Sequence, residues 1–127
     1  MRGTRLLTGL LAFAAALPVS GCSRTYEAAG DVAPSNIITV RVTNDNLLDM
    51  DVSAVAEGFA TRLGTVSGAG TRTFVLNASL AAQDFRVVAT PIGGTGRASS
   101  GTLLVSPGQM VDFRIGSMLR NSSVIIR

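Results

Sequence analysis

The chain of 127 residues contains no histidine, no lysine and no tryptophan, and its one cysteine is Cys22. Without histidine, it lacks the commonest general base and the commonest ligand of transition metals. A serine or cysteine triad that depends on histidine is therefore excluded, and so is a zinc site built from cysteine and histidine. These absences predict a protein that is not an enzyme and that uses no cofactor and no metal.

One catalytic arrangement survives these exclusions, a pair of carboxylates of the glycosidase kind. The chain has eight acidic residues, but most of them lie in predicted turns, and without tryptophan no large aromatic surface is available for a sugar. We keep an enzyme that uses carboxylates alone as the least favoured of three hypotheses.

The first 21 residues have the three parts of a secretory signal peptide. Arg2 and Arg5 make the start positive, residues 6 to 17 are almost all apolar, and small residues precede Cys22. The apolar run is shorter than the roughly 20 residues that a helix needs to cross a bilayer. Residues 1 to 21 therefore predict an export signal that is removed.

The four residues that end this signal, Val19-Ser20-Gly21-Cys22, resemble the lipobox of bacterial lipoproteins. In that family a diacylglycerol is attached to the cysteine sulfur and the chain is cut just before it. The resemblance implies lipidation at Cys22, a cell-envelope location, and contact with a membrane through the N-terminal lipid. Ser23 stands where an aspartate commonly retains family members at the inner membrane, which implies the outer membrane, facing the periplasm or the cell surface. An ordinary signal peptide with a chance thiol is the alternative.

Removal of the signal changes the charge balance. All eleven basic residues are arginines, and nine of them remain against eight acidic residues, for a formal charge of +1. No run of basic residues is left to follow a phosphate backbone, and few aromatic residues are available to stack on bases. Nucleic acid is therefore not an expected partner.

The 127 residues less 21 leave 106, a length that suits one domain. Residues 22 to 36 are small and polar without a sustained period, so we predict a flexible tether there and a folded domain over residues 37 to 127. Thirteen extended residues span at most ~45 Å and a flexible coil averages nearer ~20 Å, so the domain should stay close to its membrane. With Cys22 used for lipid, no disulfide can form and the fold must depend on its apolar core.

Apolar and polar residues alternate in several short stretches, as in strands with one buried face. Residues 77 to 84 are predicted to form a loop or a single helical turn, and Phe74, Phe85 and Phe113 are predicted to anchor the core. The predicted strands cover residues 38 to 43, 51 to 57, 59 to 66, 72 to 76, 85 to 90, 102 to 106, 111 to 115 and 123 to 126.

Seven to eight short strands, separated by turn residues, indicate an all-β fold after the signal peptide and the tether. We predict an antiparallel immunoglobulin-like β-sandwich, with a small closed barrel as the alternative. Ser106-Pro107-Gly108-Gln109 predicts a type II turn before the last long strand.

The domain also resembles small uncharacterised β-sandwich domains that follow lipoboxes in other bacterial lipoproteins. The shared features are Arg-Val-Thr-Asn at residues 41 to 44, Arg-Leu-Gly-Thr-Val at residues 62 to 66, and the Pro-Gly turn at residues 106 to 109. This resemblance implies the sandwich fold and carries no known activity.

Two stretches are candidate binding sites. Residues 44 to 51 are rich in oxygen atoms, as a calcium site would be, but they lack the spacing of an EF-hand loop, and a polar connection between strands explains them better. The glycine-rich stretch after Pro91 lacks the lysine and the following helix of a phosphate-binding loop. We predict instead that Gly93, Gly94, Thr95, Gly96 and Arg97 form a binding loop at one end of the sandwich, where Arg97 can form paired bonds with a carboxylate.

Two hypotheses of function stand above the carboxylate enzyme. The first is a lipid-anchored, non-catalytic binding or structural module of the cell envelope, which contacts an envelope protein through strand edges or end loops. The alternative is a periplasmic carrier or binding module for a lipid or another small molecule, since β-sandwiches and barrels can open between their layers.

The lipobox generates the first testable prediction. Cys22→Ser removes the sulfur that would carry the diacylglycerol, so we expect no lipid attachment and no cleavage before residue 22. Labelling of cells with a radioactive fatty acid measures this directly. Incorporation of label into the variant at the level of the unchanged protein would show that the lipobox interpretation is wrong.

Overall fold

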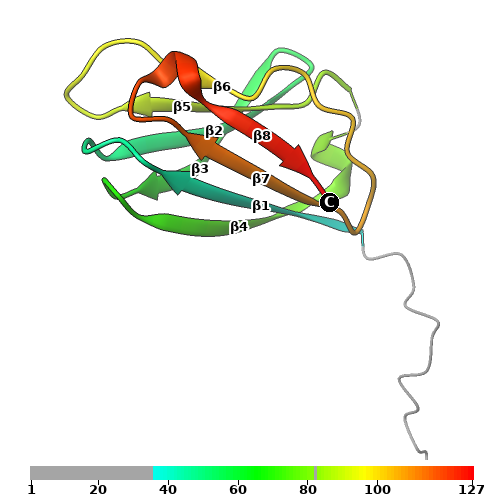
Figure 1. Ribbon diagram of the computed structural model, residues 1–127. Helices are drawn as coiled ribbons and strands as arrows, with labels where there is room; N and C mark the ends of the chain where they lie inside the picture. The colour runs from blue at the N-terminus through cyan, green and yellow to red at the C-terminus, as the bar shows by residue number, and fades with distance from the viewer. Residues whose placement is uncertain (1–35, 82) are drawn as a thin grey trace, which may run out of the picture. The chain divides into compact units, whose positions relative to one another are not determined.

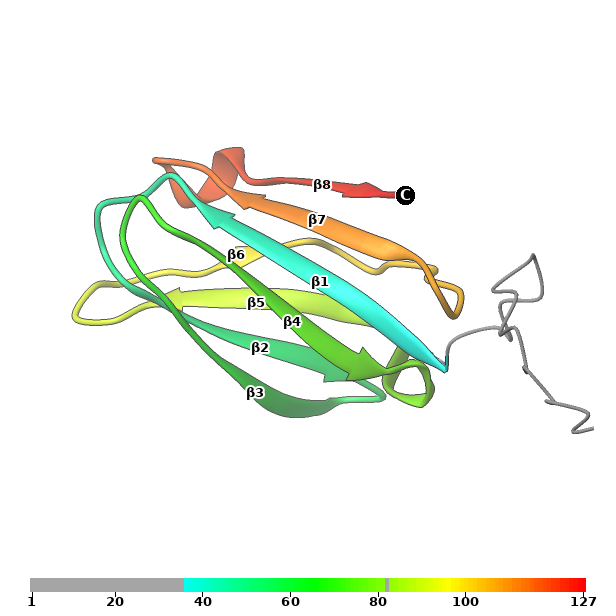
Figure 2. The ribbon, with the colours of Figure 1, turned by 90° about the horizontal axis from the view of Figure 1, so that it is seen from below.

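A computed structural model describes residues 36–81 and 83–127. These residues form two four-stranded β-sheets that pack face to face, which confirms the predicted all-β sandwich (Figures 1 and 2). The predicted signal peptide, Cys22 and the predicted tether up to residue 35 lie outside the described residues. The elements in chain order are β1 (Ile37–Asn44), β2 (Met50–Ala56), β3 (Phe59–Val66), β4 (Thr71–Asn77), the 3-10 helix η1 (Ala78–Ala81), β5 (Arg86–Pro91), β6 (Ala98–Ser99), β7 (Met110–Ile115), the 3-10 helix η2 (Leu119–Asn121) and β8 (Ser123–Ile126).

The two sheets are assembled from segments that are distant in the sequence. Sheet A has the strand order β4-β1-β7-β8, and sheet B has the order β3-β2-β5-β6. The chain therefore changes sheets after β1, after β3, after β4 and after β6. Each change carries the next apolar strand to the other layer, so both layers must form before either buries its inner face.

One strand pair corrects the prediction of a fully antiparallel sandwich, because β1 and β7 are parallel. The other pairs among the described strands are antiparallel. A parallel partner requires a long crossover connection, and here the chain passes through sheet B and returns before it enters β7 beside β1. Alternation of buried and exposed residues is the same in both kinds of pair, so the local sequence did not distinguish them.

Residues 102 to 106 do not form the strand that their composition predicted. The strand that pairs with β5 is β6, which is only two residues long, followed by an isolated bridge at Leu103. The ladder is interrupted because the hydroxyl of Ser100 accepts the N–H of Val87 at 2.9 Å, in place of a backbone carbonyl.

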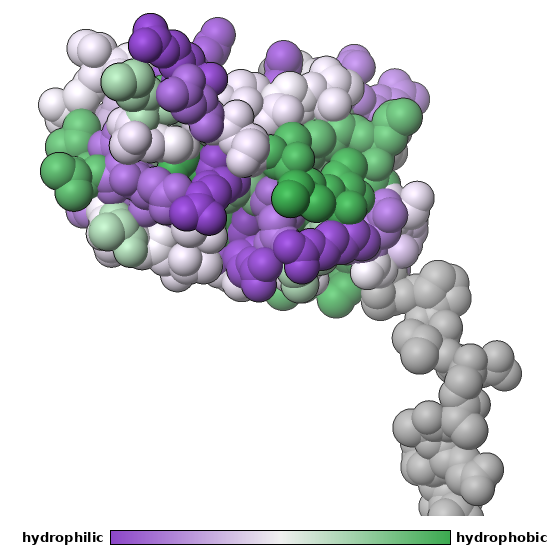
Figure 3. Space-filling model, viewed as in Figure 1, coloured by the Kyte–Doolittle hydropathy of each residue, from purple (hydrophilic) through white to green (hydrophobic). Residues whose placement is uncertain are grey.

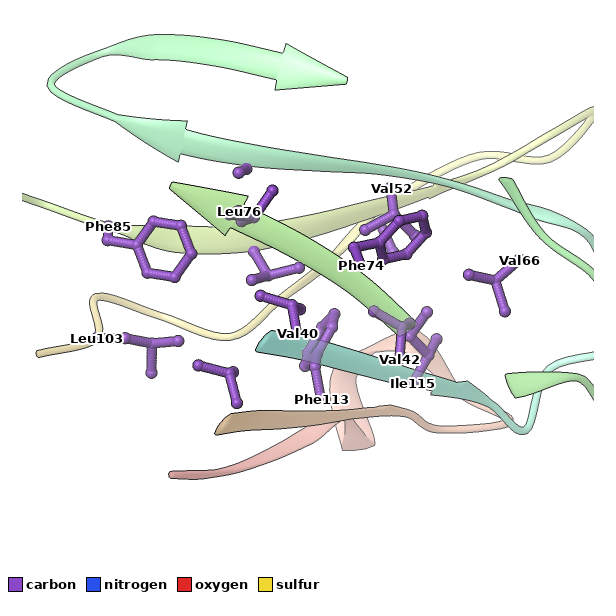
Figure 4. Close-up of a cluster of buried hydrophobic side chains, with 14 of the residues drawn as sticks. Val40, Val42, Val52, Val66, Phe74, Leu76, Phe85, Leu103, Phe113 and Ile115 are labelled. Atoms are coloured by element: carbon purple, nitrogen blue, oxygen red, sulfur yellow. The ribbon is translucent and has the colours of Figure 1, made fainter. Parts of the chain in front are cut away.

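The core lies between the sheets and consists of the inward-facing apolar residues of both (Figure 4). Phe74, Phe85 and Phe113 are buried within it, as predicted. The remaining buried apolar residues are Ile38, Val40, Val42, Met50, Val52, Ala54, Val66, Leu76, Ala81, Val87, Ala89, Ala98, Leu103, Val111 and Ile115.

Gly64 allows the two edge strands β3 and β4 to approach each other. The register between β2 and β3 skips Leu63, and Gly64 follows with a φ of 151°, a conformation that favours glycine. A Cβ atom at this position would lie 3.2 Å from the ring of Phe74 and 3.0 Å from the guanidinium of Arg72. Arg72 covers Phe74 with its guanidinium 5.1 Å from the ring centroid, so the glycine makes room for a cation–π contact that closes this edge.

The predicted turns are also present. Gln109 donates its N–H to the carbonyl of Ser106 at 3.1 Å, with Gly108 at a φ of 87°, as a type II turn requires. η1 is the predicted single helical turn, and the N–H of Ala78 at its start bonds the carbonyl of Asn36 at 2.9 Å. In the described part of the chain, no helix is long and apolar enough to cross a membrane.

The core generates the second prediction. Phe113→Ala should lower the free energy of unfolding by about 3 to 5 kcal/mol, because Phe113 is 1% exposed and its loss leaves a cavity between the sheets. Phe59→Ala is the matched control, since Phe59 is 78% exposed and should change stability by about 0.5 kcal/mol or less. Urea unfolding of residues 22 to 127 measures both values, and similar losses for the two variants would contradict the assigned core.

Candidate functional site

Four loops meet at one end of the sandwich, where β1, β3, β5 and β7 all finish (Figure 1). We call this the four-loop end, and it comprises residues 45 to 49, 67 to 70, 92 to 97 and 116 to 122. The predicted binding loop, residues 93 to 97, is one of the four. Loops at the end of a rigid sandwich are the usual place for recognition, because the sheets hold their roots in place.

Asn44, the last residue of β1, connects two of these loops from inside the protein. Its side chain is 1% exposed, and Nδ2 donates to the carbonyl of Leu48 at 2.8 Å and to that of Ser67 at 3.1 Å. Oδ1 accepts the N–H of Asn46 at 3.0 Å. The backbone N–H of Asn44 also bonds the carbonyl of Gly70 at 2.8 Å. A buried amide that makes all these bonds holds the β1–β2 and β3–β4 loops in one arrangement.

Further hydrogen bonds join the other two loops to this pair. Asn46 donates from Nδ2 to the carbonyl of Ser117 at 2.9 Å, which reaches the β7–β8 loop. Ile92 donates its N–H to the carbonyl of Asp49 at 2.9 Å, which reaches the β5–β6 loop. The four loops therefore form one connected surface rather than four independent tips.

The acidic residues of the oxygen-rich stretch are each engaged with a different protein group. Asp45 pairs with Arg114, and Asp51 pairs with Arg62 at 2.7 Å. The carboxylate of Asp49 accepts the N–H of Gly68 at 2.9 Å. Within residues 36–81 and 83–127, no group of three or more metal-ligating side chains comes together. The stretch acts as the polar connection that the sequence favoured.

All five residues of the predicted binding loop are exposed, but Gly94 and Gly96 lie against neighbouring loops. A Cβ atom on Gly94 would lie 2.9 Å from Cδ1 of Leu48, and one on Gly96 would lie 3.4 Å from Cδ1 of Leu119. The absence of side chains at these two positions lets the loop pack across the β1–β2 loop and η2. Arg97 is the last residue of this loop and directly precedes the buried Ala98 of β6.

Arg97 borders a shallow trough of about 380 Å³ on the outer face of sheet B. Arg86 of β5 also lines it, and neither arginine forms an ion pair within the described residues. Two guanidinium groups without carboxylate partners suit a ligand that carries carboxylates. The rest of the lining is made of hydroxyl and apolar side chains: Ser53, Thr90, Ser99, Val55, Val88 and Ala60.

The outer face of sheet A carries charges that are already paired with one another. Asp112 lies between Arg41, at 2.6 Å, and Arg127, at 3.1 Å. Asp45 pairs with Arg114, and its hydrogen bond and its charge raise the pKa of the Arg114 guanidinium above the usual value. These three arginines are already engaged with carboxylates, so they offer fewer free guanidinium hydrogen bonds to a ligand than the arginines of the trough on sheet B do.

The sequence indicated Arg97 but not Arg86, which the fold brings to the same trough. Arg86 is an exposed residue of β5. A single exposed arginine in a strand does not by itself indicate a binding site in the sequence. Sequence reasoning also missed the apolar side chains of the four-loop end. Leu47 is 89% exposed, and Leu48, Ile92 and Met118, which belong to the same group of loops, are also exposed.

Comparison with known proteins assigns no activity to this site. No protein-family model matches the chain, and no curated protein matches it. Among solved structures, the chain is similar to the NMR structure of a protein from Eubacterium rectale, with 14% sequence identity and a TM-score of 0.46, over 76% of this chain and 94% of that one. This likeness carries no conclusion about function.

The hydrogen bonds of Asn44 generate the third prediction. Asn44→Ala removes the donor of the partly buried hydrogen bonds to the carbonyls of Leu48 and Ser67, so it should lower the free energy of unfolding by about 2 to 4 kcal/mol. It should also speed amide hydrogen exchange in residues 45 to 49 and 67 to 70. Asn77→Ala is the matched control, because within the described residues the exposed side chain of Asn77 accepts only the local N–H of Ser79, at 3.0 Å. Equal effects of the two substitutions would contradict the role assigned to Asn44.

Proposed function

We propose that this chain is a lipid-anchored lipoprotein of the cell envelope, held at the outer membrane through Cys22, and that it acts as a non-catalytic binding module. The lipobox-like sequence supports the anchor, and the missing histidine, lysine and free cysteine support the lack of catalysis. Two lipid chains or more would give stable anchoring without a membrane-spanning helix. We also propose the immunoglobulin-like subtype for the sandwich, on the strength of its two sheets and end loops.

The observation that carries the binding role is the position of Arg97. It lies where the four-loop end meets the trough on sheet B, so a partner could contact loops and trough together. A guanidinium can donate two parallel hydrogen bonds to one carboxylate, which gives both affinity and orientation. We therefore propose an envelope protein that presents an acidic side chain or a chain terminus as the partner.

The alternative function, a periplasmic carrier for a small molecule or a lipid, would need space between the sheets. The inner faces of the described strands are filled by apolar side chains, and the trough lies on an outer face. These observations favour the binding module. Mass spectrometry of small molecules extracted from the purified protein separates the two functions, because a carrier should release a stoichiometric ligand.

The role of Arg97 generates the fourth prediction. Arg97→Gln keeps a polar side chain but removes the charge, so partner binding should weaken about tenfold or more, the loss expected for a charge-assisted hydrogen bond. The melting temperature should hardly change, because the side chain is exposed. A point substitution is preferable to deletion of the loop, since deletion would displace buried Ala98.

Arg120→Gln is the matched control for this measurement. Arg120 is also exposed at the four-loop end, in η2, but it does not line the trough. Envelope proteins that co-purify with the unchanged protein are quantified in both variants by mass spectrometry, and the affinity of each is then measured directly. If both variants retain every partner equally, Arg97 does not contribute to partner binding and its loop only connects two strands.

A further inference from the structure

The end of the sandwich opposite the four-loop end also exposes large apolar side chains. We call it the entry end, because β1 begins there at Ile37, beside the start of β3, β5 and β7. Phe59, directly after the β2–β3 turn, is 78% exposed, and Leu104, in the connection before β7, is 90% exposed. Figure 3 shows an apolar area at this end. The exposed large apolar residues of β8 and of the connection before β7 are Ile125 and Leu104.

Single exposed apolar residues are normal on a protein surface, so what matters here is where these residues lie relative to Cys22. Thirteen residues separate Cys22 from Asn36, and they span at most ~45 Å when fully extended. A strand of eight residues such as β1 is about 27 Å long. A lipid on Cys22 would therefore bring the four-loop end to the membrane only if the connecting chain ran back along the sandwich over about 27 Å, which is more than the ~20 Å that a flexible coil of this length averages. The entry end meets the same membrane without that loss of chain entropy.

We propose that the entry end contacts the lipid bilayer that holds Cys22, with Phe59 and Leu104 inserted among the lipid headgroups. The inference rests on the proposed anchoring and adds an orientation to it. With the entry end on the bilayer, the four-loop end points away from the membrane. Arg97 is then accessible to a partner on the side of the domain that faces away from the bilayer.

Two side chains bury too little apolar area to hold an unattached domain on a bilayer. Attachment through a short chain changes this, because it gives the domain an effective concentration of about millimolar at the surface. A contact that is too weak to recruit the free domain is then populated in the attached one. The contact therefore orients the domain rather than recruiting it.

The charges of the entry end suit a neutral bilayer. Glu57 and Asp84 are exposed there, and Arg86 and Arg127 stand near the same end, with Arg127 as one of the two arginines that share Asp112. An anionic surface would gain little attraction from this arrangement. We therefore expect contact with phosphatidylcholine vesicles that changes little with salt concentration.

The experiment uses the fact that the chain has one cysteine and no tryptophan. Residues 22 to 127 are coupled through the Cys22 thiol to a maleimide lipid in phosphatidylcholine vesicles, with and without brominated acyl chains. Phe59→Trp and Leu104→Trp each place one fluorescent reporter at the entry end. Leu47→Trp is the matched control, because Leu47 is 89% exposed at the four-loop end.

We expect a blue shift and loss of intensity with brominated lipid for Phe59→Trp and Leu104→Trp, and neither change for Leu47→Trp. The unattached variants should show no change with the same vesicles. Equal responses of all three reporters, a response of Leu47→Trp alone, or no response at all would overturn the proposal. Because the coupling is chemical, the result does not depend on processing at the lipobox, so failure of the proposed anchoring would appear separately in the Cys22→Ser labelling experiment.

Discussion

The buried amide of Asn44 is the interaction on which the functional end of this protein depends. β1 is a central strand of sheet A, and its last side chain turns inward to bond the carbonyls of two loops that belong to different strand connections. Burial of an amide is unfavourable unless its hydrogen bonds are made, and here they are. These bonds tie the end of β1 in sheet A to the β1–β2 loop just before β2 and to the β3–β4 loop just after β3.

The hydrogen bonds of the four-loop end matter because this domain has no disulfide to hold its loops. A domain of about 90 residues without cross-links has a small margin of stability, which its apolar core must supply. The core fills the space between the sheets, whereas the loops outside it contribute little apolar burial. Polar contacts at Asn44, Asn46 and Asp49 therefore hold the loops in place, and the glycines of the predicted binding loop let it pack onto them.

The two outer faces differ in a way that bears on binding. On sheet A the charged residues are engaged with one another, with Asp112 between two arginines. On sheet B, Arg86 and Arg97 line a trough without an acidic partner in the described part of the chain. Exposed guanidinium groups that have no carboxylate partner within the protein can donate paired, charge-assisted hydrogen bonds to a carboxylate of a ligand. Sheet B and its end loops are therefore the surface on which we base the binding role.

The sequence by itself determined the fold class, most of the strands, the three phenylalanines of the core and the place of the Gly93 to Arg97 loop. These features depend on alternation, turn residues and glycine, which act within a few residues of the chain. Only the tertiary structure decided that β1 and β7 are parallel, that residues 102 to 106 form no strand, and that Arg86 joins Arg97. Each of these depends on partners far apart in the sequence, such as the Ser100 hydroxyl that takes the N–H of Val87. Long-range pairing of this kind leaves no periodic signal, because the same local pattern is compatible with several partners.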